Sequence, residues 1–160
     1  MKLGKVTQNR TAVPQVSTDL RAGLIGRGIQ QSRSPRMHVA EGTRLGLSYD
    51  YRLFDFDTLN LNDSDLPGLI ASLRLEGFSG LNITHPFKER VIPALDRLSA
   101  DARAIGAVNT VVFDGDEAVG YNTDWWGFAE SFKRDLVDPE LNSVVMIGAG
   151  GAGMAVATAL

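Results

Sequence analysis

Residues 81–88 read LNITHPFK, and the rest of the chain is organised around this stretch. It begins as an apolar run typical of a buried strand, and Pro86 prevents simple continuation of a strand or a helix. Lys88 therefore falls at a strand-to-helix corner, where folds commonly present reactive side chains. The simpler interpretation of an isolated lysine is a solvated residue at an ordinary strand end.

The segments on either side of this stretch alternate between strand and helix patterns. Besides the quoted run, strands are predicted at 21–26, 48–56, 107–113, 118–121 and 144–147. Helices are predicted at 35–45, with Ser34 as N-cap, at 66–76, 100–106, 125–136 and 154–160, and a short interrupted helix around Pro93. This alternation predicts an α/β fold: a three-layer α/β/α open sheet, mostly parallel, with a hairpin at 114–116 as its antiparallel interruption.

The composition limits what the chain can be. Its 160 residues, 44% of them hydrophobic and 22% charged, are enough for one sizeable core of a soluble globular protein. A net charge of -3 disfavours nucleic acid and anionic membranes as partners. The lack of cysteine excludes disulfides, thiolate zinc and a cysteine nucleophile, and the presence of only two histidines argues against a metal site.

The location of the protein is also constrained by its sequence. No apolar run approaches the length of a membrane span. Residues 1–20, interpreted as a leader, lack the apolar segment of a secretory signal. We therefore expect a cytoplasmic protein.

A glycine loop follows the last predicted strand. The run 144–147 leads directly into the residues Gly148, Ala149, Gly150, Gly151, Ala152 and Gly153, and a helix pattern continues from Met154. In this context a G-x-G-x-x-G pattern predicts a dinucleotide site for NADP or NAD, with the pyrophosphate on amides at the helix N-terminus. The alternative is a purely structural tight turn.

The residue that would choose between NAD and NADP lies ~20 residues beyond such glycines, past Leu160. We therefore expect 142–160 to be the truncated start of a Rossmann NAD(P)-binding domain. Residues 21–136 then form a separate substrate-binding, catalytic domain.

Four polar clusters precede the glycine loop, each taken to lie at the C-terminal side of a predicted strand. They are Ser32 to Ser34, Thr84 with Lys88, Asn109 with Thr110, and Asn122 to Asp124. In an open α/β sheet, ligands bind at the carboxyl ends of the strands, so the four clusters can meet in one crevice. Each also has a structural interpretation: Ser34 and Asp124 as helix N-caps, and Asn109 as a satisfied buried amide.

Taken together, these motifs resemble the shikimate dehydrogenases from about Ala22 to the end of the chain. The resemblance rests on five motifs in the same order: Ser32-Arg33-Ser34-Pro35, Asn82-Ile83-Thr84-x-Pro86-x-Lys88, Gly106-Ala107-Val108-Asn109-Thr110, Asn122-Thr123-Asp124 and the loop 148–153. It covers almost the whole substrate domain of that family and only the opening of its nucleotide domain.

The resemblance implies a role for each motif. The serines matching Ser32 and Ser34 hold the substrate carboxylate in the family. The residues matching Thr84, Lys88, Asn109 and Asp124 bind the ring hydroxyls, and the lysine and aspartate form the acid/base pair while the nicotinamide transfers hydride. Chemistry agrees, because reducing a ketone needs a proton for the developing alkoxide, and a lysine can supply it.

Several positions depart from the usual family pattern. Gln31 stands where histidine is typical, Gly28 where proline is, and His85 and Phe87 replace a small residue and a histidine. These features resemble the quinate/shikimate or aminoshikimate branches, whereas Ser34, rather than threonine, favours shikimate over quinate. The reaction class is unaffected.

We therefore expect an oxidoreductase that interconverts 3-dehydroshikimate and shikimate, or a quinate or aminoshikimate analogue, with NADP(H) or NAD(H). Its partner would be a small hydroxy acid, and it would be a monomer or homodimer; the 160 residues alone would be inactive. Two alternatives remain open: a carboxylate-binding module without catalysis, and another two-domain dehydrogenase of the methylene-folate type.

Overall fold

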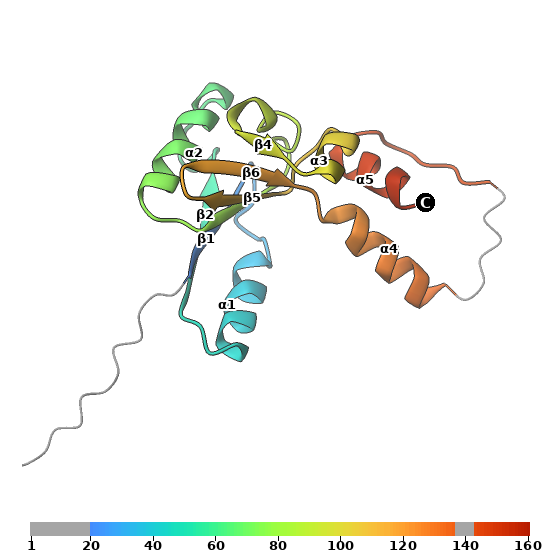
Figure 1. Ribbon diagram of the computed structural model, residues 1–160, viewed down its shortest axis with the longest axis horizontal. Coiled ribbons are helices and arrows are strands. Elements are labelled where there is room, and N and C mark those ends of the chain that lie inside the picture. Colours follow the sequence, from blue (N-terminus) through green and yellow to red (C-terminus); the bar gives the residue numbers. More distant parts are fainter. Residues whose placement is uncertain (1–19, 137–142) are drawn as a thin grey trace, which may run out of the picture.

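The computed structural model describes residues 20–136 and 143–160, and its elements alternate as the sequence predicts (Figure 1). The strands are β1 (Leu20–Gly26), β2 (Tyr49–Asp55), β3 (Gly80–Ile83), β4 (Arg97–Leu98), β5 (Thr110–Asp114) and β6 (Glu117–Tyr121). The α-helices are α1 (Ser34–Arg44), α2 (Leu66–Leu75), α3 (Ala100–Ile105), α4 (Asp124–Asp135) and α5 (Gly151–Ala159). Two short 3₁₀ helices are η1 (Asp63–Asp65) and η2 (Ile92–Ala94).

The strands form one six-stranded sheet in the order β2-β1-β3-β5-β6-β4. Strand β1 pairs in parallel with β2 and β3, and β4 pairs in parallel with β6. Strand β5 runs antiparallel to both of its neighbours, β3 and β6. In Figure 1, α2 lies above these strands and α1 below them. The predicted open, mostly parallel α/β sheet with one antiparallel hairpin is thus confirmed.

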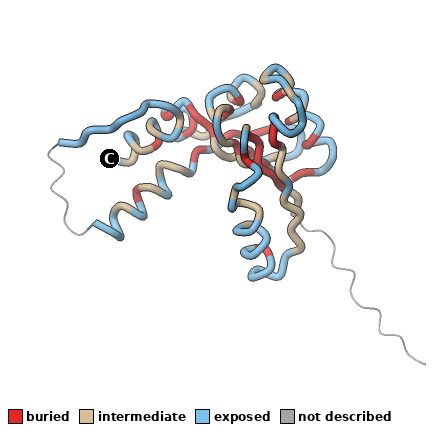
Figure 2. Tube along the Cα trace, turned by 180° about the vertical axis from the view of Figure 1, so that it is seen from behind, coloured by how far each residue is buried: buried red, intermediate tan, exposed pale blue. Residues whose placement is uncertain are grey.

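The main core lies between the sheet and α2. Helix α2 turns Leu66, Ile70 and Leu73 towards the sheet, as their helical spacing predicts. They join buried strand residues such as Ile83 and Val111, and Figure 2 shows the buried residues concentrated along the strands. Burial of these side chains holds the strands in register and fixes the positions of their ends.

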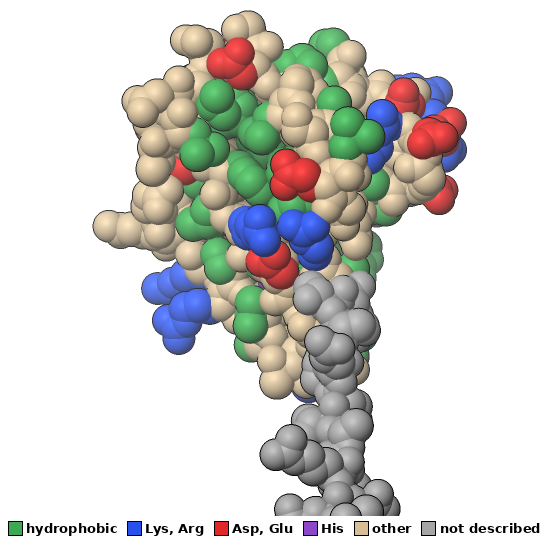
Figure 3. Space-filling model, turned by 90° about the vertical axis from the view of Figure 1, so that its left-hand side faces the viewer, with side chains coloured by type: hydrophobic (Ala, Val, Ile, Leu, Met, Phe, Trp, Pro, Cys, Tyr) green, Lys and Arg blue, Asp and Glu red, His purple; other side chains and the backbone are tan. Residues whose placement is uncertain are grey.

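The surface carries charges of both signs. In the face shown in Figure 3, basic and acidic side chains lie next to one another. Among the ion pairs of the described residues, Arg52 binds Asp50 at 2.6 Å within β2, and Arg27 binds Asp57 at 2.6 Å. Exposed pairs of this kind add little to stability. No helix among the described residues has the length and apolarity that crossing a membrane requires.

The predicted strand at 144–147 is wrong. These residues are extended without a ladder partner, and Val145 and Ile147 are 90% and 98% exposed. A strand needs a neighbour to satisfy its backbone groups, and within the described part of the chain none of the six strands pairs with this segment. Helix α5 also begins at Gly151, earlier than the predicted Met154.

Two smaller expectations also need correction. The predicted helix around Pro93 is a 3₁₀ turn followed by β4, because Arg97 and Leu98 pair with β6. Of the leader predicted at 1–20, Leu20 belongs to β1, and residues 1–19 lie outside the described part of the chain. The proposed division into domains stays a prediction.

Two leucine substitutions on α2, one buried and one exposed, test where the core lies. We expect Leu73→Ala to lower the free energy of unfolding by about 2–5 kcal/mol, because Leu73 is 2% exposed and its removal leaves a cavity. Leu75→Ala on the same helix should change it by less than about 0.5 kcal/mol, because Leu75 is 85% exposed. Urea denaturation measures both, and equal losses would place the core elsewhere.

Candidate active site

One edge of the sheet collects the polar residues predicted from the sequence. Lys88 follows the end of β3, and Asp124 follows β6 as the first residue of α4. Asn109 was expected at the C-terminal side of its strand, but it precedes β5. Because β5 is antiparallel to β3 and β6, its beginning lies at the same edge as their ends. The antiparallel hairpin predicted at 114–116 therefore brings the beginning of β5, and with it Asn109, to this edge.

Lys88 and Asp124 form the central contact of this edge. The Lys88 Nζ lies 2.5 Å from the Asp124 Oδ2, and the two side chains are 19% and 35% exposed. Such a half-buried pair is less screened than a surface ion pair, so it holds the ammonium group in one place. The interpretation of Lys88 as a freely solvated lysine is therefore wrong.

Asn109 supports the aspartate from the other side. Its Nδ2 donates to the Asp124 Oδ1 at 2.8 Å and to the Thr123 Oγ1 at 2.9 Å. Its Oδ1 accepts from the Thr123 amide and from the Thr110 hydroxyl, each at 3.0 Å. Asn109 is thus fully hydrogen-bonded, and one of its partners is the aspartate that binds Lys88.

The turn before α4 fixes where Asp124 stands. The buried Asn122 donates from Nδ2 to the carbonyl of Ala107 at 3.0 Å, and its Oδ1 accepts from the Asp124 amide at 3.0 Å. Asp124 is the first helical residue, and the N-cap position belongs to Thr123. Its carboxylate therefore faces Lys88 and Asn109. The structural interpretation of Asp124 as the N-cap of α4 is wrong.

The serine pair lies in the loop before α1. The Ser32 Oγ accepts from the Ser34 amide at 3.2 Å and donates to the Ser34 Oγ at 3.2 Å. Ser34 is the first residue of α1, so its predicted role as N-cap is wrong, and Arg33 holds that position without a side-chain cap. Both hydroxyls stand at a helix N-terminus, which favours an anion. Among the described residues, no hydrogen bond joins this pair directly to Lys88.

A buried carboxylate that the sequence analysis missed holds this loop. Asp55 is 2% exposed, and its oxygens accept from the amides of Gly28 and Ile29, each at 3.0 Å, and from the Gln30 side chain at 3.1 Å. Burial opposes ionisation, but these bonds and one from the Asp57 amide outweigh it and keep the pKa of Asp55 below its usual value. The one sequence signal for this role was the presence of an acidic residue within the predicted strand 48–56.

Thr84 stands where β1 and β3 meet. Its amide donates to the carbonyl of Ile25 at 2.9 Å, and a Cβ on Gly26 would lie 2.5 Å from its Cγ2. Only a glycine therefore lets the two strand ends approach so closely. The next residue, His85, is exposed and precedes a cis peptide bond to Pro86, as suits a corner residue. Thr84 shares its surroundings with Lys88 but forms no hydrogen bond to the Lys88–Asp124 pair.

A crevice of about 700 Å³ separates this corner from the glycine loop. Thr84, His85 and Lys88 line one wall, and Gly148 with the segment 150–153 lines the other. Helix α5 closes the crevice by packing the buried Ala155 against a cluster that includes Ala107 and Trp125.

The glycine loop fits a dinucleotide in two respects. A Cβ on Gly153 would lie 2.5 Å from the Gly148 carbonyl oxygen, so only glycine permits this tight turn. The first amides of α5 follow it directly, and a helix N-terminus is a favourable place for a pyrophosphate. Its residues thus have the chemistry that NADP or NAD requires. No cluster of three or more metal-ligating side chains occurs in the described ranges.

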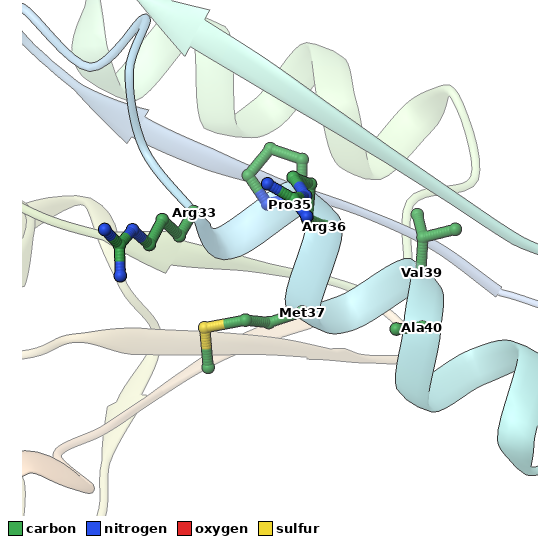
Figure 4. Close-up of a pocket in the computed structure, with 6 residues that line it drawn as sticks. All are labelled: Arg33, Pro35, Arg36, Met37, Val39 and Ala40. Atoms are coloured by element: carbon green, nitrogen blue, oxygen red, sulfur yellow. The ribbon is translucent and has the colours of Figure 1, made fainter.

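A second hollow lies on the outer face of α1, beside the serine loop. It is lined by Arg33, Pro35, Arg36, Met37, Val39 and Ala40. Figure 4 shows Arg33 and Met37 extending to the same side of the first turn of α1. Arg33 and Pro35 of the serine motif contribute to it, but Ser32 and Ser34 do not, whereas Thr84 and Lys88 line the crevice beside the glycine loop.

Known proteins resemble this chain over most of its length. The family model described as the shikimate dehydrogenase substrate binding domain matches residues 24–111. The shikimate dehydrogenase (NADP(+)) of Streptomyces avermitilis is 56% identical over 138 residues, which are 86% of this chain and 47% of the relative. The quinate/shikimate dehydrogenase (NAD(+)) of Corynebacterium glutamicum is 47% identical over 139 residues, 86% of this chain and 49% of the relative.

Solved structures agree with these matches. The quinate dehydrogenase of Corynebacterium glutamicum in complex with NAD superposes with a TM-score of 0.80 at 44% identity, covering 88% of this chain and 50% of that one. The Thermus thermophilus enzyme in complex with NADP(H) and shikimate gives 0.78 at 38% identity, covering 88% and 51%. The chain thus spans about half the length of the curated relatives it matches.

The hydrogen bonds that the Asp55 carboxylate accepts predict that removing its charge will lower stability in a pH-dependent way. Asp55→Asn should lower the free energy of unfolding at pH 7 by about 2 kcal/mol, because an amide cannot accept from four donors. A depressed folded pKa stabilises the fold above the unfolded pKa of about 4, and this contribution is lost as the pH falls through the folded pKa. The deficit should therefore shrink in acid. Chemical denaturation measures the deficit, and Asp116→Asn in the exposed β5–β6 turn is the control. A deficit that does not change with pH would contradict the hydrogen-bonded, ionised state assigned to Asp55.

Proposed function

The chain belongs to the shikimate dehydrogenase family, and on that premise we propose that the protein interconverts 3-dehydroshikimate and shikimate, or a quinate or aminoshikimate analogue, with NADP(H) or NAD(H). The observation that carries the proposal is the contact of 2.5 Å between Asp124 and Lys88, because Lys88 lines a crevice whose other wall is the glycine loop. A proton donor and a dinucleotide-type loop share one space there.

Lys88 supplies the proton in this proposal. When the ring ketone is reduced, a hydride joins the carbonyl carbon and the oxygen becomes an alkoxide, which takes a proton from the Lys88 ammonium group. In the oxidation of shikimate, the neutral amine takes the hydroxyl proton back. A bound nicotinamide supplies or accepts the hydride. The positive charge of Lys88 also stabilises the oxyanion before the proton moves.

Asp124 and Asn109 hold the lysine and the substrate. One oxygen of Asp124 binds Lys88 and the other accepts from Asn109, so the carboxylate is fixed in position. The ion pair also holds the Lys88 ammonium group in place beside the crevice that Lys88 lines. With Thr84 nearby, Lys88 and Asp124 offer donors and acceptors to ring hydroxyls, and Asn109 binds a hydroxyl by exchanging one of its present hydrogen bonds.

The serine pair is the proposed carboxylate site. Ser32 and Ser34 place two hydroxyls at the N-terminus of α1, where donors and the helix dipole both favour a negative group. The carboxylate would bind here and the reacting carbon would lie towards Lys88. Relatives with NADP(+) and with NAD(+) in their names match this chain, so both cofactors are included. The proposal includes a cytoplasmic location and a monomer or homodimer.

We expect Lys88→Ala to lower kcat for shikimate oxidation by about 10²–10⁴-fold, because the general acid–base group is removed. The assay follows reduction of NADP+ or NAD+ by the complete gene product, and circular dichroism checks that the fold is intact. Lys133→Ala is the control, because its side chain is 75% exposed and lies in the last turn of α4, at the opposite end of that helix from Asp124.

The wild-type protein distinguishes the proposal from its alternatives. Shikimate binding without reduction of either cofactor would favour a carboxylate-binding module. Inactivity on all shikimate-like acids would favour another two-domain dehydrogenase. Near-normal turnover in Lys88→Ala would remove Lys88 from the mechanism while leaving the reaction class in place.

The serine pair is tested by Ser34→Ala. Loss of one hydroxyl that binds a carboxylate should raise the KM for shikimate by about tenfold or more and change kcat much less. Ser131→Ala, an exposed serine on α4, should leave both constants unchanged. If Ser34→Ala lowers kcat alone, the carboxylate binds elsewhere.

A further inference from the structure

A continuous chain of hydrogen bonds crosses the sheet and ends at Asp124. The Tyr51 hydroxyl on β2 donates to the Asn82 Oδ1 on β3 at 2.7 Å, and the Asn82 Nδ2 donates to the Thr110 Oγ1 on β5 at 3.4 Å. Thr110 donates to the Asn109 Oδ1 at 3.0 Å, and Asn109 donates to Asp124 at 2.8 Å. Tyr51 and Asn82 were not among the site residues predicted from the sequence.

The register of the sheet makes this chain possible. Asn82 and Thr110 are direct partners across β3 and β5, so their side chains share one face. Tyr51 is separated from Asn82 by β1, where its own partner is Ala22. The β1 partner of Asn82 is Leu24, two residues further along, so the ring of Tyr51 reaches diagonally across β1 to place its hydroxyl against Asn82.

All four hydrogen bonds of this series point the same way: in each, the donor is the residue farther from Asp124 and the acceptor is the nearer one. Hydrogen bonds aligned in this way polarise one another, and an anion at the accepting end strengthens the series. The direction of the bond between Asn82 and Thr110 depends on the first donor, Tyr51, whereas Asn109 is held both by Thr110 and by the Thr123 amide. If the Tyr51 hydroxyl were absent, the Asn82 amide could rotate and offer its oxygen to Thr110. The single proton of Thr110 could then go to Asn82 in place of Asn109.

The surroundings of Tyr51 keep its hydroxyl a donor. Burial raises the pKa of Tyr51, the nearby Tyr49 raises it further, and the Ser34 hydroxyl opposes them only partly. The ring stacks on His38 with centroids 4.4 Å apart and planes inclined by 12°. Tyr51 is therefore held between α1, which carries the proposed carboxylate site, and the side chains that lead to Asp124.

We propose that Tyr51 is a positioning residue that, through Asn82 and Thr110, orients the Asn109 amide towards Asp124 and so holds the acid–base pair. The proposal rests on the proposed function for its effect on turnover, but the orientation of Asn109 is a property of the chain without ligand. Tyr51 also stacks on His38 of α1, the helix that begins at the proposed carboxylate site. It does not touch the reacting atoms.

The orientation can be measured without any activity. In ¹⁵N–¹H correlation spectra of the 17.3 kDa chain, the side-chain amide signals of Asn109 should move by more than a linewidth in Tyr51→Phe and Thr110→Val. They should not move in Tyr49→Phe, because the Tyr49 hydroxyl contacts His38 and lies outside the chain of bonds. Unchanged Asn109 signals in Tyr51→Phe would overturn the proposal.

Kinetics of the complete gene product then test the consequence. Tyr51→Phe and Thr110→Val should each lower kcat by about tenfold without changing the KM for the dinucleotide, because a small misplacement of the acid–base pair slows the chemical step. Thr110→Ser keeps the hydroxyl and should restore kcat. The double variant Tyr51→Phe/Thr110→Val should be no slower than either single variant, because both break the same series.

The outcomes separate this inference from the proposed function. An inactive wild-type protein would contradict the proposed function, and the Asn109 signals would still decide the orientation. An active wild type with kcat unchanged in Tyr51→Phe would contradict the inference alone. Fully multiplicative losses in the double variant, or no rescue by Thr110→Ser, would show that the two residues act separately and would overturn it.

Discussion

The antiparallel pairing of β5 with β3 and β6 is the constraint on which the site depends. In a purely parallel sheet, the segment before β5 would lie at the opposite edge from Lys88. Reversal of this one strand brings Asn109 to the edge where β3 and β6 end, and the short β5–β6 hairpin then returns the chain to Asp124. A single hairpin is therefore enough to bring the three polar segments to one edge of the sheet. The main core on the α2 side holds the strands that end there.

Electrostatics explains why these polar groups are arranged as a network. A half-buried ammonium group is costly unless a carboxylate faces it, and a half-buried carboxylate needs donors for its other oxygen. Lys88 and Asn109 satisfy the two oxygens of Asp124 between them. Asp55 solves the same problem beside the serine loop with backbone amides and one glutamine. Both carboxylates thereby order a segment that faces the proposed substrate site.

The sequence predicted the order of elements and the polar clusters well, because apolar periodicity and turn residues are local signals. The pairing of Lys88 with Asp124 was expected only through the family resemblance, and contacts that depend on register were not predicted. Asp55 was counted within a strand, and Tyr51 and Asn82 were not recognised. Apart from the Asp57 amide, the partners that identify them lie 25 or more residues away and depend on register. The strand expected at 144–147 failed for a related reason: its residues have strand propensity, but propensity forms no strand without a neighbouring one.

The close packing of α5 adds a second requirement at the glycine loop. A Cβ on Gly151 would lie 3.2 Å from the Lys88 Cβ and 3.1 Å from that of Ala107, which is closer than most such contacts. The absence of a side chain at Gly151 therefore lets the helix N-terminus approach the stem of the lysine. A larger residue would force either α5 or Lys88 to move, and Lys88 is held by Asp124. Glycine here serves the spacing between the proposed proton donor and the dinucleotide loop, in addition to the backbone approach that an anion requires.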